Sequence, residues 1–137
     1  MMYAKFTIAY WCVLVAAFLP YACAWMAKSK GFGKPRSQGG YDNNAPREWL
    51  ARQEGWKARA NAAQANTFEA LPFFFAAVII AHQLGAPQTQ VDILALLFIT
   101  LRIIYVAMYV AGLPKTRSAI WGAAFLVNVA ILLSGWR

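Results

Sequence analysis

The sequence predicts an all-α integral membrane protein, a four-transmembrane-helix bundle that forms a single domain over residues 1–137. Of these residues 61% are hydrophobic and only 13% are charged, and the mean hydropathy is +0.44. A soluble domain carries about 25% charged residues. The apolar residues also gather into four runs, each close to the roughly 20 residues that a membrane-spanning helix needs. The composition therefore excludes an ordinary soluble domain.

The elements can be placed in chain order. The apolar runs cover residues 6–27, 70–91, 93–113 and 118–136. With their flanking turns we expect helices at about 4–27, 46–84, 90–113 and 117–136, and a loop at about 28–45. The loop is rich in Gly, Ser, Asn and Pro, and Pro87 and Pro114 mark the later turns. Gly55 marks a bend in the second helix, where Trp49 and Trp56 suit the level of the lipid headgroups.

The basic residues predict the orientation of the bundle. Ten of the 13 Lys and Arg residues lie in two connections, at 28–59 and 115–117. By the positive-inside rule these connections are cytoplasmic and both termini are periplasmic. The net charge of +8 is thereby explained by topology, so we expect contacts with membrane lipids and no nucleic-acid partner.

Polar side chains at membrane depth are the candidate functional residues, because they are costly there. They lie in three places. One face of the second helix carries Arg59, Asn66 and Glu69, and one face of the third helix carries Arg102, Tyr105 and Tyr109. The last helix begins with Arg117 and Ser118. We expect Glu69 and Arg102 to form a buried ion pair between the second and third helices. Asn128 in the last helix is expected to hydrogen-bond to another helix. Because no His, Cys, Asp and Glu residues have the spacing of metal ligands, we expect no metal site.

These residues carry a resemblance to a known family. The run NTFEALPF at 66–73, with Arg59 and Ala60 before it, resembles the second helix of the MAPEG family, the membrane-associated proteins in eicosanoid and glutathione metabolism. The spacing of Arg102, Tyr105 and Tyr109 is similar to the third helix of that family. The Arg-Ser pair at 117–118 is similar to the start of its fourth helix. The length and the four spans resemble the short bacterial branch.

The resemblance implies a homotrimer in the bacterial inner membrane, with glutathione sites between subunits on the cytoplasmic side. It implies a transferase or peroxidase that uses glutathione as co-substrate and acts on a lipophilic small molecule, an electrophile or a lipid hydroperoxide. Arg117 would stabilise the glutathione thiolate, with Ser118 beside it. The glutathione would be bound by Arg59, Asn66, Glu69, Arg102, Tyr105 and Tyr109.

One departure from the family pattern keeps a second interpretation open. Members of the family carry basic residues four and one positions before the Asn, and a His two positions before it. This sequence has Ala62, Ala65 and Gln64 there. The alternative is therefore a non-catalytic accessory subunit with a membrane-protein partner, or a lipid-binding trimer with a degenerate glutathione pocket. Arg52, Lys57 or Arg59 are the nearby cations that could replace the missing ones.

Overall fold

The computed structural model describes residues 5–136, and all regular structure in this part of the chain is helical. The four long helices are α1 (Ile8–Lys28), α3 (Trp56–Gln83), α4 (Gln88–Ala111) and α5 (Pro114–Leu133). The first loop contains the 3-10 turn η1 (Arg36–Gln38) and the short helix α2 (Pro46–Ala51). Each of the long helices is long and apolar enough to cross a membrane. The predicted all-α bundle with four spans is confirmed.

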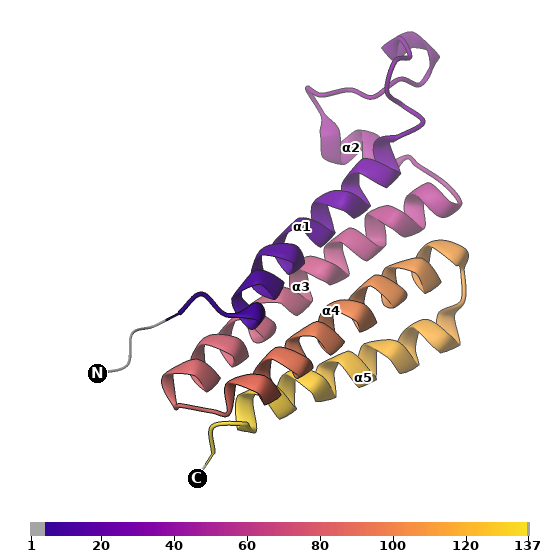
Figure 1. Ribbon diagram of the computed structural model, residues 1–137. Coiled ribbons are helices and arrows are strands. Elements are labelled where there is room, and N and C mark those ends of the chain that lie inside the picture. The colour runs from indigo at the N-terminus through magenta and orange to yellow at the C-terminus, as the bar shows by residue number, and fades with distance from the viewer. Residues whose placement is uncertain (1–4, 137) are drawn as a thin grey trace.

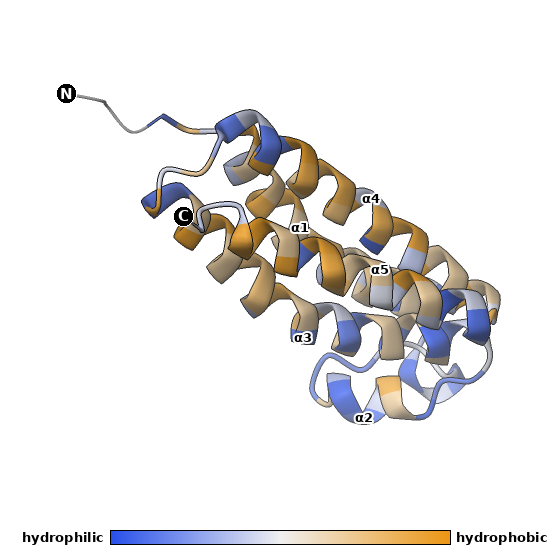
Figure 2. Cartoon of the chain, turned by 90° about the horizontal axis from the view of Figure 1, so that it is seen from below, coloured by the Kyte–Doolittle hydropathy of each residue, from blue (hydrophilic) through white to orange (hydrophobic). Residues whose placement is uncertain are grey.

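The four long helices run side by side and alternate in direction (Figure 1). α3 and α4 each pack against α1, against α5 and against one another, so α1 and α5 lie at the two sides of the bundle. We call the end at which α1 and α4 finish and α3 and α5 begin the basic end. The first loop and α2 lie there, and residues 5 and 136, the limits of the described chain, lie toward the opposite end. Figure 2 shows hydrophobic residues along the long helices and hydrophilic residues gathered at the basic end.

Small residues and stacked aromatic rings form the core. Ala9, Ala77 and Ala95 are fully buried where the helices meet, and small side chains allow helix backbones to approach closely in membranes. Phe74 and Phe98 stack between α3 and α4 with their ring centres 4.2 Å apart. Many large hydrophobic side chains stay exposed on the outer faces of the helices. These faces suit lipid or other protein chains.

A polar contact fixes the opposite end of the bundle. The Asp92 carboxylate on α4 accepts a hydrogen bond from the Ala9 backbone N–H at 2.9 Å and another from the Gln88 amide at 2.7 Å. The Thr7 hydroxyl caps α1 by accepting from the Tyr10 N–H at 3.1 Å. Because the first N–H groups of a helix have no partner within it, the contacts of Ala9 and Tyr10 satisfy two of these groups in α1.

The segment 46–84, expected as one helix with a bend, is two helices. α2 finishes at Ala51 and α3 begins at Trp56. Between them Gly55 has φ 62° and ψ −139°, a backbone region that is essentially restricted to glycine. The last helix begins at Pro114 rather than at 117, because proline suits the first turn of a helix. The first helix begins at Ile8, and the start predicted at residue 4 lies outside the described residues.

The first loop folds around Trp49, which we expected among lipid headgroups. Only 4% of its surface is exposed, its ring lies edge-on to Tyr41 at 5.2 Å, and its Nε1 donates to the Gly39 carbonyl at 3.2 Å. A side chain at Gly31 would overlap the indole ring. The loop therefore has a small core of its own, next to the basic end of the bundle.

Candidate functional site

Arg102 is the largest side chain that the described part of the chain buries completely, with 1% of its surface exposed. Its Nη2 donates hydrogen bonds to Asn66 Oδ1 at 3.0 Å and to Thr67 Oγ1 at 3.1 Å, both on α3. The Thr67 hydroxyl donates in turn to the Ala63 carbonyl at 2.7 Å, so its oxygen is left to accept from Arg102. The guanidinium also lies 4.1 Å from the centre of the Tyr105 ring. Neutral acceptors and an aromatic face therefore hold this cation.

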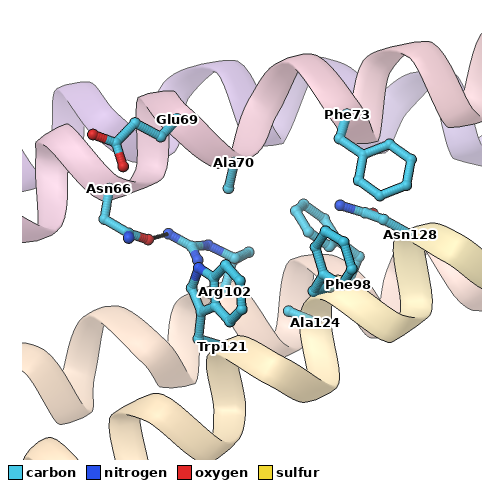
Figure 3. A pocket seen from close by; sticks show the side chains of 10 residues that line it. Asn66, Glu69, Ala70, Phe73, Phe98, Arg102, Trp121, Ala124 and Asn128 are labelled. Atoms are coloured by element: carbon cyan, nitrogen blue, oxygen red, sulfur yellow. Dashed lines mark hydrogen bonds between the residues drawn. The ribbon is translucent and has the colours of Figure 1, made fainter.

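The ion pair expected between Glu69 and Arg102 is not formed, so that prediction is wrong. The single salt bridge among residues 5–136 lies in the first loop. Glu69 is exposed, and Figure 3 shows its carboxylate turned to the side, away from the guanidinium. Arg102 approaches α3 between Asn66 and Thr67. At about 100° per residue, Glu69 lies roughly 110° around the helix from that direction.

A pocket of about 230 Å³ opens toward the basic end beside this network. It is lined by Asn66, Tyr105, Arg117, Ser118 and Trp121, which come from α3, α4 and α5. We call it the mouth pocket. Four of its five residues were candidates from the sequence, and Trp121 was missed. Trp121 follows Arg117 by four residues, about one helical turn, so the spacing indicates that both side chains lie on the same face of the last helix.

Tyr109 orients the cation of the mouth pocket. The Arg117 guanidinium lies 4.2 Å from the centre of the Tyr109 ring, and Tyr109 lies edge-on to Tyr105 with ring centres 5.8 Å apart. Such a cation–π contact is worth about 0.5–1 kcal/mol at exposed sites. Within residues 5–136 the Arg117 side chain forms neither a hydrogen bond nor a salt bridge. Its N–H donors are therefore left for a ligand.

Arg59 lies apart from the other candidates. Its Nε donates to the Val110 carbonyl at 2.9 Å, and its guanidinium lies beside Gly112, where α4 finishes. The last carbonyls of a helix lack partners within it, so Arg59 satisfies one of them and joins α3 to α4. It shares a helical face with Asn66, but seven residues separate them by roughly 10 Å along the axis.

A second pocket, which we call the inner cavity, lies next to the mouth pocket between α3, α4 and α5 (Figure 3). Its volume is about 240 Å³. Its lining is aromatic, small or polar: Phe73, Phe98, Trp121 and Phe125; Ala70 and Ala124; and Asn66, Glu69, Arg102 and Asn128. The hydrogen bond expected from Asn128 to another helix is not formed within residues 5–136, and Oδ1 of this buried amide has no partner there.

The two alanines that depart from the family pattern line a hollow on the outer side of α3. Ala62 and Ala65 share it with Arg47 of α2 and with the polar side chains of Asn61 and Gln64. None of the cations named from the sequence as possible replacements lines this hollow. Arg47, which sequence reasoning missed, does. The sequence pattern held little indication of this contact, because α2 is not one of the four apolar spans and its position relative to α3 depends on the break at Gly55.

Fold and site together define a class of protein: a four-span helical membrane protein with a buried cation and a polar pocket that opens at its basic end. The chain matches the MAPEG family model over residues 8–135, and it therefore belongs to the MAPEG family. No curated protein and no solved structure is matched by the chain. Among residues 5–136 no three His, Cys, Asp or Glu side chains gather in a way that could hold a metal ion.

Proposed function

We propose that the protein is a glutathione-dependent transferase or peroxidase that acts on lipophilic electrophiles or lipid hydroperoxides. The observation that supports this most is the Arg117 guanidinium, held over Tyr109 at 4.2 Å and lining a pocket with Asn66, Tyr105 and Ser118. The pocket offers one cation without a carboxylate partner and several neutral hydrogen-bonding groups. That combination suits a peptide with a thiol that has to become a thiolate.

The chemistry assigned to Arg117 is stabilisation of that thiolate. A free thiol titrates near 8.5, so little of it is ionised at neutral pH. A nearby cation favours the charged form, and arginine keeps its charge next to lipid. In conjugation the sulfur forms a bond to an electrophilic carbon, whose leaving group departs with the bonding electrons, and the thiol proton goes to solvent. In hydroperoxide reduction the sulfur attacks the terminal oxygen, the O–O bond breaks, and the alcohol leaves after taking up a proton, so that glutathione becomes a sulfenic acid. The thiol of a second glutathione then attacks this sulfur and forms the disulfide, with loss of water.

The carboxylates of glutathione need further cations, and we assign Arg47 to one of them. Arg47 lines the hollow that also contains Ala62 and Ala65, the positions at which the family resemblance leads us to expect basic residues. An arginine binds a carboxylate through two parallel N–H donors. A cation supplied by α2 would thus replace cations that other members of the family carry on α3.

The assembly that we propose is a homotrimer in the bacterial inner membrane, with the basic end in the cytoplasm. Glu69 supports a partner chain, because it is exposed on the side of α3 near the middle of a membrane-spanning helix. A carboxylate facing lipid there would be costly. A neighbouring subunit that covers this side of α3 would supply Glu69 with a polar partner.

The test is the thermal stability of the detergent-solubilised protein with glutathione and with its analogue in which serine replaces cysteine. Glutathione at 100 times its Kd should add about 2.7 kcal/mol to the free energy of unfolding. The serine analogue should add less, because it has no sulfur for Arg117 to bind as a thiolate. If neither peptide raises the stability at millimolar concentration, the proposal is wrong.

The second candidate is a non-catalytic membrane protein, either an accessory subunit or a lipid-binding trimer. The observation that favours it is the pair Ala62 and Ala65, which leaves the outer hollow with Arg47 as its single cation. The same stability measurement separates the two candidates, since this one predicts no response to glutathione and a response to anionic lipid.

A further inference from the structure

We propose that the inner cavity is a binding site for a compact, neutral, mainly aromatic molecule that carries one hydroxyl group. The hydroxyl would form a hydrogen bond with the Asn128 amide, and the apolar body would lie among the aromatic side chains of α3, α4 and α5. As a binding site this proposal is independent of glutathione. The idea that the bound molecule then reacts at the mouth pocket rests on the proposed function.

The walls of the inner cavity suit a planar apolar molecule. Phe98 is buried and fixed by its stacking on Phe74, and Trp121 stacks on Phe125 with ring centres 5.6 Å apart. Phe73 contacts the same Phe125 ring at 5.4 Å. An apolar cavity of about 150 Å³ is enough to bind benzene. The inner cavity, at about 240 Å³, has room for a molecule with two fused rings.

Asn128 gives the cavity its preference for a ligand with a hydroxyl group. Only 3% of the surface of Asn128 is exposed, and its amide lies between Phe73 and Phe98 with the nitrogen foremost (Figure 3). Its Oδ1 has no partner among residues 5–136. A buried polar atom without a partner costs about 1–3 kcal/mol. A hydroxyl on the ligand accepts from the amide nitrogen that faces the cavity, or donates to Oδ1 when the amide group turns over.

The charges around the cavity favour a neutral ligand. Arg102 and Glu69 both line it toward the basic end, so one cation and one anion are present and neither a cationic nor an anionic ligand gains a net attraction.

The position of the cavity explains how such a ligand reaches it. Trp121 and Phe125 line the cavity and are exposed on the side of α5, so a lipophilic molecule can enter sideways from the bilayer or from a neighbouring subunit. Asn66 and Trp121 line both the inner cavity and the mouth pocket. The two pockets therefore adjoin, and a molecule in the inner cavity would lie next to a thiol bound at Arg117.

The experiment compares 1-naphthol with 1-methylnaphthalene, which has nearly the same shape and no hydrogen-bonding group. Binding is measured by calorimetry in detergent, with protein-free micelles subtracted. The wild-type protein should bind the naphthol about fivefold more tightly, the effect of one net hydrogen bond. Asn128→Leu, which keeps the volume and removes the amide, should remove this preference and leave the binding of methylnaphthalene unchanged.

Two further variants complete the design. Ala70→Leu places extra carbon atoms in the cavity and should weaken both ligands. Thr100→Val is the matched control, because Thr100 lies exposed on α4 and its hydroxyl bonds only to the Leu96 carbonyl; it should bind both ligands as the wild type does. If neither ligand binds the wild type above the micelle blank, the cavity holds only water and the proposal is overturned. A naphthol preference that survives Asn128→Leu would overturn it equally.

Discussion

Replacing Asn66 with Leu should lower the free energy of unfolding by about 1.5 kcal/mol, mainly through Arg102. The change removes the acceptor of the 3.0 Å hydrogen bond and leaves Nη2 with Thr67 as its single partner. Interhelical hydrogen bonds in a membrane protein averaged about 0.6 kcal/mol, with a maximum near 1.7. Bonds to charged groups in soluble proteins contribute about 1.5–3 kcal/mol. Because Arg102 is 1% exposed and its guanidinium cannot reach water, we expect a cost of about 1.5 kcal/mol, where the two ranges overlap.

A double-mutant cycle with Arg102→Met isolates this contribution. The free energy of unfolding is measured by titrating mixed micelles with a denaturing detergent, at one protein concentration because any assembly makes stability concentration-dependent. In the Arg102→Met background, Asn66→Leu should cost less than about 0.5 kcal/mol, the range within which independent changes add. The same cycle with Glu69→Gln is the control, and its coupling to Arg102 should be near zero.

The opposite pattern would refute this description of the buried cation. If Glu69 and Arg102 show a coupling of about 1.5 kcal/mol while Asn66 and Arg102 simply add, the carboxylate is the partner of Arg102 after all. The sequence-based expectation would then be right, and the hydrogen bonds to α3 would be secondary.

Three other predictions concern separate parts of the molecule. Asp92→Leu should lower the free energy of unfolding by about 1 kcal/mol, as the loss of a helix cap does, because the Ala9 N–H loses its acceptor; an unchanged midpoint of detergent unfolding would contradict this. Arg47→Gln should weaken glutathione binding about tenfold, the effect of 1.4 kcal/mol, in a calorimetric titration, whereas equal affinity would remove Arg47 from the site. Ser37→Cys, in a chain without its native cysteines, should resist membrane-impermeant thiol reagents in intact cells, and rapid labelling would reverse the proposed orientation.

The bundle could be predicted from the sequence because the length of an apolar run and its lack of charge are properties of a whole segment. Four runs of about 20 apolar residues have few alternatives to four spanning helices. The break at Gly55 was harder to predict, because a glycine inside a helical pattern is compatible with a bend in one helix or with the end of one helix and the start of another. Its φ of 62° depends on how α2 packs. Trp49 was misplaced for a related reason, since a tryptophan near a membrane suits both the headgroups and a folded loop.

The candidate site was harder to predict, because helical spacing gives the face of a helix and not the partner of a side chain. Asn66 and Glu69 share a face with one another, yet Arg102 meets Asn66 and Thr67. Neighbouring residues point about 100° apart around a helix, so the rotation of α3 about its axis determines which of its residues face Arg102. The spacing of polar residues in the sequence does not fix that rotation. Asn128 illustrates the same limit, because a polar residue at membrane depth suggests a partner that the described chain does not supply.

The most direct test of the central proposal is the ultraviolet difference spectrum of glutathione bound to the detergent-solubilised protein at neutral pH. The wild type should show the thiolate band, and Arg117→Leu should lose it while conjugation slows by about 100- to 1,000-fold, as after loss of one stabilising group. Lys115→Leu is the control, because this neighbouring cation does not line the mouth pocket, and it should keep the band. A wild type without the band at saturating glutathione, or an Arg117→Leu variant that retains it, would contradict the proposal.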